Sequence, residues 1–462
     1  MKRIDLLPDD VLLGIFEFSV NANSNGSKTW IEAWQTLVHV CRRWRSLVFR
    51  SPRRLNLRLY CTPQTPARDT LNIWPALPLI IVGSMTISSG TGNTIAALGQ
   101  SNRVRAAILM NLANRQLEEA LAAMQVPFPE LTDLQLSSHD EAPPVIPDSF
   151  LDGSAPRLRI FSLDGIPFPG SPKLLLSANH LVYLRLFNIP HSGYISPDVI
   201  VSLLCALSSL KTLSLGFRSP QSSPGWESQS LPPPKRSILP VLDKFIFKGV
   251  TEYLEELLTF IDTPRLENLS MTFFNQIDFD CPRLAQFINR TPTLRARAEA
   301  HVRFHDWSTS VVLVAGPGSR TLEISISCAE PDWQLSSIEQ VCNSSLSALS
   351  MVEVLYIVHG YWRLVWKNDA IENTLWLQLL LPFTAVKNLY LSTESAPGIA
   401  AALQELVGAR ITEVLPSLQN IFVEGPRVEP PGPLQENIGQ IAAARQQSGH
   451  PITISVWDRR KP

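Results

Sequence analysis

The sequence predicts an α/β protein in which a short N-terminal helical module precedes one long solenoid of repeats. Apolar residues recur at three- and four-residue steps near the N-terminus, as in amphipathic helices. Beyond residue 70 they recur instead in short leucine-patterned segments, separated by loops rich in Pro, Ser and Gly. Of the 462 residues, 45% are hydrophobic and 18% are charged, which is typical of a folded chain with ample core material.

Charge and cysteine content narrow the functional class. Lys and Arg number 40 and Asp and Glu number 41, so the formal net charge of −1 favours neither a nucleic-acid partner nor an anionic membrane. No apolar stretch approaches the roughly 18 residues that a membrane span needs. The six cysteines are scattered without close pairing, and the N-terminus lacks an apolar signal core. We therefore expect an intracellular protein of the cytoplasm or nucleus.

The helical module is predicted over residues 1–58. Between Leu7 and Phe18 the apolar residues keep a helical period, with Pro8 suited to a first turn. A polar segment, 21–28, interrupts the pattern, which resumes from Trp30 and predicts one or two further helices that end near Ser51. Three short helices bury little surface by themselves, so we expect their apolar face to need a partner or the following domain.

The second region, 70–462, contains a repeated Leu-x-x-Leu-x-Leu pattern whose successive copies lie about 23 to 32 residues apart where the series is unbroken. The copies begin at Leu131, Leu158, Leu181, Leu210, Leu242, Leu266, Val352, Val386 and Leu418, with weaker candidates at Val104–Leu109 and at Leu322, Ile324 and Ile326. Such self-similarity is the sign of leucine-rich repeats. We predict an irregular leucine-rich-repeat solenoid, with parallel strands on a concave face and helices or loops on a convex face.

Between and after the repeats, composition predicts further elements. Helical return segments are expected at 197–207, 251–261 and 398–407. The stretch near 219–237 is rich in Pro, Ser, Gln and Gly and predicts a mobile loop, and 426–433 predicts a second Pro-rich break. The alternation in 451–457 predicts a closing edge strand.

The N-terminal module carries a specific motif. Leu7-Pro8-Asp9-Asp10-Val11-Leu12-Leu13, Ile15-Phe16 and the segment from Leu37 to Leu47, LVHVCRRWRSL, follow one another in that order. This pattern resembles the F-box, the segment through which substrate receptors join SCF ubiquitin ligases. The resemblance covers about the first 50 residues, and its flank looks like the F-box proteins of basidiomycete fungi, which commonly continue into irregular leucine-rich repeats.

The resemblance implies a set of residues that contact a Skp-family adaptor, which links to a cullin. These residues are Leu7, Pro8, Ile15, Phe16, Leu37, Val40, Cys41 and Trp44. Arginines beside them, Arg42, Arg43, Arg45, Arg50, Arg53 and Arg54, would form a basic rim. The polar spacer 21–28 is longer than in the family. The alternative is a helical cap over the first repeat, in which Phe16 and Trp44 are plain core residues.

A target would contact the residues that alternate with the repeat leucines, because successive strand side chains point to opposite faces. They are Asp133, Gln135, Tyr183, Arg185, Phe187, Asn268, Ser270, Asn388, Tyr390, Asn420 and Phe422. Among them the types enriched in binding hot spots are Tyr183, Arg185, Phe187, Tyr390 and Phe422, which we take as candidate target contacts.

No catalytic motif or cofactor site is expected, since the sequence lacks phosphate-binding, dinucleotide, nucleophile-elbow and Cys-x-x-Cys patterns. The best metal candidate is the pair His301 and His305. Alternation favours a strand there, which would separate them by roughly 13 Å, too far for one zinc. Together with the missing catalytic motifs, the resemblance to the F-box implies a non-catalytic, substrate-recognition subunit of an SCF-type E3 ubiquitin ligase that holds an unknown protein target. The alternative is a repeat scaffold or adaptor-binding protein without a ubiquitination role.

Overall fold

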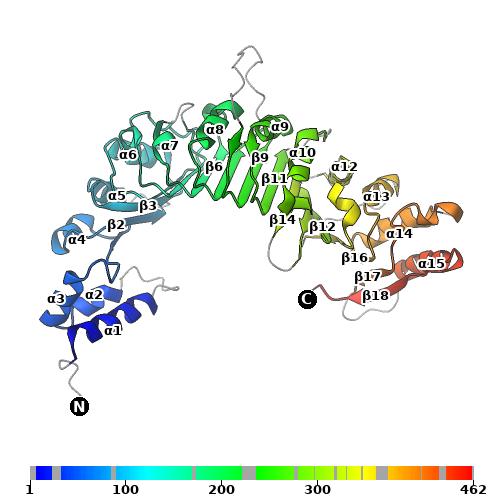
Figure 1. The fold of residues 1–462 in the computed structure, drawn as a ribbon, viewed down its shortest axis with the longest axis horizontal. Coiled ribbons are helices and arrows are strands. Elements are labelled where there is room, and N and C mark those ends of the chain that lie inside the picture. The colour runs from blue at the N-terminus through cyan, green and yellow to red at the C-terminus, as the bar shows by residue number, and fades with distance from the viewer. Residues whose placement is uncertain are drawn as a thin grey trace, which may run out of the picture. The chain divides into compact units, whose positions relative to one another are not determined.

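The computed structural model describes residues 7–22, 33–84, 90–168, 173–220, 236–274, 279–295, 297–316, 320–328, 330–344, 347–360, 373–406, 408–425 and 433–459. The chain forms two compact units, Met1–Ile195 and Ser196–Pro462. In each unit most strands are followed by a helical segment, and these segments lie along one face of the sheet, whereas the three N-terminal helices do not belong to this pattern (Figure 1).

The first unit opens with three helices, α1 (Asp9–Ala22), α2 (Ala33–Val38) and α3 (Arg42–Arg50). Helix α1 begins one residue after Pro8, and its two acidic first-turn residues suit the positive end of the helix. Helix α3 begins after Cys41, whose Sγ accepts a hydrogen bond from the backbone N–H of Trp44 at 3.5 Å. The helices predicted before Ser51 are thus confirmed.

The rest of the first unit is a sheet of six parallel strands in the order β1-β2-β3-β4-β5-β6. The strands are β1 (Leu59–Cys61), β2 (Leu79–Ser84), β3 (Val104–Met110), β4 (Asp133–Ser137), β5 (Ile160–Asp164) and β6 (Tyr183–Ile189). The helical segments are α4 (Ala67–Ile73), α5 (Thr91–Leu98), α6 (Asn114–Ala123), η2 (Phe150–Gly153), α7 (Lys173–Ser177) and η3 (His191–Gly193). The sheet therefore begins at Leu59, earlier than the boundary at residue 70 that the leucine pattern predicted.

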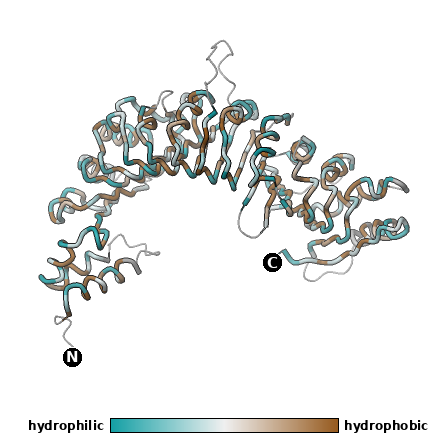
Figure 2. Tube along the Cα trace, viewed as in Figure 1, coloured by the Kyte–Doolittle hydropathy of each residue, from teal (hydrophilic) through white to brown (hydrophobic). Residues whose placement is uncertain are grey.

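The repeat pattern explains this sheet. Leu134, Phe161 and Leu184 occupy the same position in successive copies, and they are direct neighbours across β4, β5 and β6. All three are buried, whereas residues between the repeat leucines are more exposed. Hydrophobic residues recur along the strands in Figure 2 for the same reason. The predicted leucine-rich-repeat architecture is confirmed: each copy adds one parallel strand whose leucines pack under the return segments.

The second unit continues the same plan with a sheet in the order β7-β9-β11-β14-β13-β12-β15-β16-β17-β18 and a separate pair, β8 and β10. Its strands are β7 (Thr212–Phe217), β8 (Ser237–Ile238), β9 (Lys244–Gly249), β10 (Ile261–Asp262), β11 (Asn268–Phe274), β12 (Glu299–His305), β13 (Ser308–Val314), β14 (Thr321–Ser327), β15 (Val354–His359), β16 (Asn388–Leu391), β17 (Asn420–Glu424) and β18 (Thr453–Trp457). Its helical segments are α8 (Pro197–Leu204), α9 (Thr251–Phe260), α10 (Pro282–Arg290), α11 (Pro292–Arg295), α12 (Pro331–Asn343), η4 (Ser347–Met351), α13 (Asn373–Leu380), α14 (Ala396–Gln404), η5 (Gly408–Thr412) and α15 (Pro433–Gln447). The three predicted return helices and the closing strand are confirmed as α8, α9, α14 and β18.

One part of this sheet departs from the predicted parallel array. Strand β13 pairs antiparallel with both β12 and β14, and the three strands stand in reverse order between β11 and β15. The prediction of parallel strands throughout is wrong here. The two residues between β12 and β13, Asp306 and Trp307, can join only antiparallel neighbours, because a parallel pair needs a crossover of a dozen or more residues.

Two predicted loops fall mostly outside the described residues. Within the expected mobile loop near 219–237, residues 221–235 are not described, and Ser237 already belongs to β8. Within the Pro-rich break at 426–433, residues 426–432 are not described, and α15 begins at Pro433. Among the helices of the described ranges, none is both long and apolar enough to cross a membrane.

Candidate functional site

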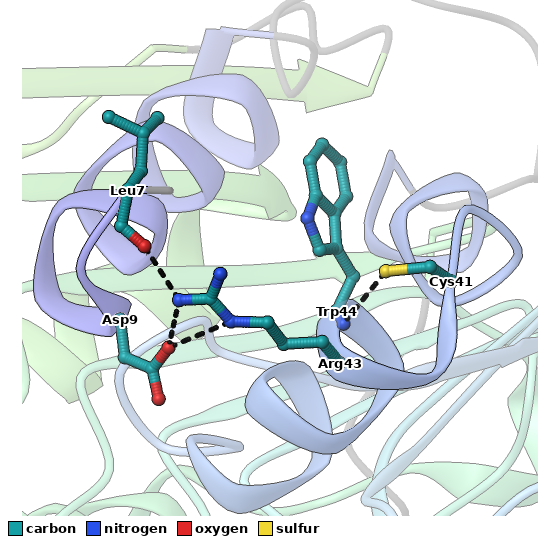
Figure 3. Close-up of polar contacts among 5 residues, drawn as sticks. All are labelled: Leu7, Asp9, Cys41, Arg43 and Trp44. Carbon is teal, nitrogen blue, oxygen red and sulfur yellow. Dashed lines mark hydrogen bonds and ion pairs between the residues drawn. The ribbon is translucent and has the colours of Figure 1, made fainter. Parts of the chain in front are cut away.

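Polar contacts join the two halves of the N-terminal motif. Arg43 of α3 donates to the carbonyl oxygen of Leu7 at 2.6 Å and to Oδ1 of Asp9 at 2.6 and 3.1 Å (Figure 3). Arg54 forms a second ion pair with Glu17 of α1 at 3.3 Å. Two of the six arginines of the predicted basic rim are thus paired with acidic groups of α1. Exposed pairs of this kind contribute at most about 1 kcal/mol, so they orient the helices more than they stabilise them.

An apolar core lies beneath these polar contacts. The ring of Phe16 in α1 lies 4.7 Å from that of Trp44 in α3, and Phe16 is 0% exposed. Leu37 of α2 is buried as well. Phe16 and Leu37, two of the predicted adaptor contacts, therefore lie inside the module. For Phe16 this is what the alternative of a helical cap predicted. Trp44 is half-buried and keeps part of its surface accessible.

An apolar stripe remains on the outside of α1. Val11, Ile15 and Phe18 are 43%, 49% and 77% exposed, and their spacing places them on one face of the helix. Leu12 and Phe16, each one residue further along, are buried. Of the stripe, only Ile15 was among the predicted contacts. Val11 and Phe18 stand four residues before and three residues after Ile15, and this helical spacing could have identified them as part of the same surface.

The remaining predicted adaptor contacts lie near the start of α1 and of α3. Leu7 is half-buried and Pro8 exposed. Val40, before α3, is 59% exposed, and Cys41 is half-buried. Six of the eight predicted residues thus keep accessible surface.

A residue that the sequence interpretation did not single out ties the module to the first repeat. Trp34 of α2 is fully buried, and its indole Nε1 donates to the carbonyl oxygen of Arg58 at 3.1 Å. Its ring lies 5.2 Å from that of Trp74, the residue after α4, in an edge-on arrangement. The helical module and the first repeat therefore share a buried aromatic contact.

The open face of the first sheet, the face opposite the helices, carries three predicted target contacts on β6. Arg185 lies over the ring of Phe187, with its guanidinium carbon 4.1 Å from the ring centroid, and pairs with Asp164 of β5 at 2.9 Å. Asn188 donates to the same carboxylate at 2.7 Å. Tyr183 lies on the same strand and is half-buried. Asp164 and Asn188 belong to this cluster but were not predicted, since neither falls between two repeat leucines.

The open face of the second sheet carries a stack of four rings. His301 of β12, Tyr356 of β15, Tyr390 of β16 and Phe422 of β17 are neighbours in register. Their successive ring centroids lie 4.5, 4.4 and 4.4 Å apart, with interplanar angles of 6°, 17° and 10°. Tyr390 and Phe422 were predicted contacts, and Tyr356 was missed although it too stands between two apolar strand residues.

The stack has polar neighbours. Burial lowers the pKa of His301, although its Nε2 lies 2.5 Å from Oε1 of Glu299, and burial raises the pKa of Tyr356. Both rings are therefore neutral at neutral pH. Beside the rings, Thr453 donates to the side chain of Asn420, which donates to that of Asn388 at 2.7 Å. This amide row fixes the strand positions that carry the rings.

The C-terminal strand adds a ring at right angles to the stack. The indole of Trp457 donates from Nε1 to the carbonyl oxygen of Leu391 at 3.3 Å. Its ring centroid lies 5.2 Å from that of Tyr390 and 5.9 Å from that of Tyr356. Arg459 then donates to the carbonyl oxygen of His359 at 2.7 Å. The residues after β18 thus cross back over the neighbouring strands.

Within the described ranges, no three His, Cys, Asp or Glu side chains come together as a metal site. The segment with His301 and His305 is strand β12, as predicted. The hydroxyl of Ser392 lies 3.2 Å from Nδ1 of His359, but both residues are buried. Burial also raises the pKa of the Cys281 and Cys342 thiols, which disfavours the nucleophilic thiolate.

Comparison with known proteins adds little to this geometry. No protein-family model matches the chain, and no curated protein matches it. Among solved structures, it is similar to the crystal structure of the leucine-rich repeat-containing protein LegL7 from Legionella pneumophila. The two are 13% identical with a TM-score of 0.28, and the match covers 84% of this chain and 98% of that one. A TM-score this low supports no argument about fold or function. The repeat architecture is therefore inferred from the strand pairing and burial of this chain alone.

Proposed function

We propose that this protein is the substrate-recognition subunit of an SCF-type E3 ubiquitin ligase, which docks to a Skp-family adaptor through its N-terminal helices and holds a protein target on its repeats. The observation that carries the proposal is the exposed apolar stripe of Val11, Ile15 and Phe18, within the segment that resembles the F-box. Full burial of an exposed side chain of this kind contributes about 1.5 to 3 kcal/mol, and these three side chains, 43%, 49% and 77% exposed, would contribute a corresponding part of it at the centre of a docking surface.

The surroundings of the stripe suit a protein partner. Pro8 adds apolar surface from the same motif half, and Val40 and the accessible part of Trp44 add it from the other half. Arg42 and Arg45 are exposed on α3, and a basic edge of this kind would steer an acidic partner. The buried pair Phe16 and Leu37 would support this surface from within rather than touch the adaptor.

In this function the chain performs no chemistry. A target held on the open strand faces would have its lysines concentrated near the conjugating enzyme that the cullin recruits. The two clusters with hot-spot residues are Arg185 with Phe187 in the first unit and Tyr390 with Phe422 in the second. The alternative, a repeat scaffold or an adaptor-binding protein without a ubiquitination role, would use the same faces but assemble no cullin complex.

The test is co-expression of the full chain with a Skp-family adaptor, followed by size-exclusion chromatography. Replacing Val11 and Ile15 by Glu should weaken the complex by on the order of 100-fold, because binding would bury two unpaired charges. Val126→Glu is the matched control, since Val126 is similarly exposed, at 46%, on a surface outside the helical module. Equal adaptor binding by the double variant and the control would refute the proposed surface.

A second stage separates the proposal from its alternative. The purified adaptor complex is mixed with a cullin, and the assembly is followed by the same chromatography. Co-elution of all three proteins supports a ligase subunit. An adaptor complex that excludes the cullin favours the alternative.

A further inference from the structure

The ring stack of the second unit is closed at one end and open at the other. At the inner end, His301 is in register with Val312 of β13, a buried apolar residue. At the outer end, Phe422 is in register with Ser455 of β18, which is exposed. The inner ring therefore ends against an aliphatic side chain, whereas the outer ring is followed by a small hydroxyl.

The geometry of the stack defines a vacant position. Neighbouring strands in a sheet lie about 4.8 Å apart, which matches the centroid spacing of 4.4 to 4.5 Å between successive rings. One more ring at this spacing would stand above Ser455. Among the described residues, Tyr390 is the ring in stacking contact with Phe422, and the residue that follows Phe422 in register, Ser455, is exposed and carries no ring.

The neighbours on β18 leave this position open. Thr453 and Trp457 flank Ser455 on the same face of the strand. The hydroxyl of Thr453 is bonded to Asn420, and the indole of Trp457 leans toward Tyr390. Both side chains are thus held away from the space above Ser455.

The chemistry of the position favours a neutral ring over a cation. All three residues on this face of β18 are uncharged. The carboxylate on β17, Glu424, is in register with Trp457 and not with Ser455. A guanidinium above Ser455 would lack a counter-charge in its own row, whereas an aromatic ring needs none and would gain a stacking partner.

We propose that the space above Ser455 is a slot for one aromatic side chain of an extended target segment, which would become the next ring of the stack after Phe422. The slot lies on the strand face to which the proposed function assigns target binding, and it requires a target segment with an aromatic side chain. The inference therefore rests on the proposed function. The four stacked rings are already ordered, so a fifth ring would bind without rearranging the site.

The slot can be tested on the full chain with small probes. Saturation-transfer NMR would be recorded with N-acetyl-tryptophanamide, N-acetyl-tyrosinamide and N-acetyl-argininamide. We expect the two aromatic amides to bind, and Ser455→Phe to weaken them at least about tenfold by occupying the slot. The matched control is Ile454→Phe, the same new side chain on the opposite face of the same strand, which should bind as the natural chain does. Unchanged binding by Ser455→Phe, or binding of the arginine amide alone, would overturn the proposal.

A second readout needs no ligand. Because the phenyl ring of Ser455→Phe would stack on Phe422, this variant should unfold at a higher temperature than Ile454→Phe, whose ring has no such neighbour. An equal or lower midpoint would mean that the position does not accept a ring. Phe422→Leu, which keeps apolar volume but removes the stacking face, should weaken the aromatic probes several-fold.

The slot and the adaptor surface can fail separately. The Val11→Glu, Ile15→Glu double variant should keep its affinity for the aromatic amides while it loses the adaptor. Loss of probe binding in that variant would contradict an independent slot. Normal adaptor binding with no probe binding in the natural chain would overturn the slot and leave the proposed function intact.

Discussion

Phe16 of α1 and Trp44 of α3 pack with their ring centroids 4.7 Å apart, and the first ring is fully buried while the second keeps part of its surface. The two residues come from the two halves of the N-terminal motif, which a polar segment separates in the sequence. Their contact joins the two halves in one three-helix module. Val11, Ile15 and Phe18 remain exposed on the outer face of this module.

Phe16→Ala should therefore destabilise the helical module and not merely its surface. Removing a buried phenylalanine ring costs about 3 to 5 kcal/mol, which is more than a core of three short helices can absorb. Hydrogen exchange followed by mass spectrometry should show lost protection in α1 and α3 and unchanged protection in β4 to β6. Ile15→Ala, which truncates an exposed neighbour, is the control and should leave both regions protected. Unaltered exchange in α1 of Phe16→Ala would contradict its role as the module's core.

Arg445 is the second position where a single change should be costly. It is 1% exposed in α15, and its guanidinium donates to the carbonyl oxygens of Leu415 at 3.1 Å and Val414 at 2.8 Å. Arg445→Met would keep the aliphatic volume but leave both carbonyls without these donors, at a cost of about 2 to 4 kcal/mol. Urea unfolding followed by circular dichroism measures the loss.

The matched control for Arg445 is Arg410→Met. Arg410 is exposed and pairs with Glu413 at 2.7 Å, so its removal should cost under about 1 kcal/mol. If the two variants unfold at the same urea concentration, the buried hydrogen bonds of Arg445 contribute no more than a surface ion pair.

His359 predicts how stability depends on pH. Burial lowers the pKa of this histidine from 6.5 to about 4, against a smaller opposing effect of Glu394. Between pH 6.5 and 4 the unfolded chain therefore binds a proton at this histidine that the folded chain does not bind. The free energy of unfolding thus has its full value above pH 6.5 and falls as the pH drops toward 4. Between pH 7 and pH 5 this residue alone should lower the free energy of unfolding by about 2 kcal/mol.

His359→Gln should remove that part of the pH dependence, because glutamine does not titrate. The measurement compares urea unfolding at pH 7 and pH 5 in the natural chain and the variant. His180→Gln, which changes an exposed histidine, should keep the full loss. Equal losses in all three proteins would show that His359 is already protonated or becomes exposed before the chain unfolds.

The elements that were predictable from the sequence are those set by local periodicity. The apolar steps in residues 7–18 indicated α1, and the Leu-x-x-Leu-x-Leu copies indicated strands such as β4, β5 and β6. Strand β13 was not predicted, because its run of apolar residues from Val311 to Val314 has neither a helical period nor a repeat signature. Tyr356 lies within a predicted copy, but its place in the stack depends on β12 lying beside β15, which the repeat pattern does not specify.

By itself, the sequence determined that this protein is a helical module followed by leucine-patterned repeats, because the spacing of apolar residues along the chain differs between helices and strands. Only the tertiary structure decided that Phe16 is core while Ile15 is surface, that β14, β13 and β12 stand in reverse order, and that His301 stacks on Tyr356. These outcomes depend on which distant segments become neighbours. The local pattern indicates which strand residues alternate, but the order of the strands and the stacking of rings across them are properties of that pairing.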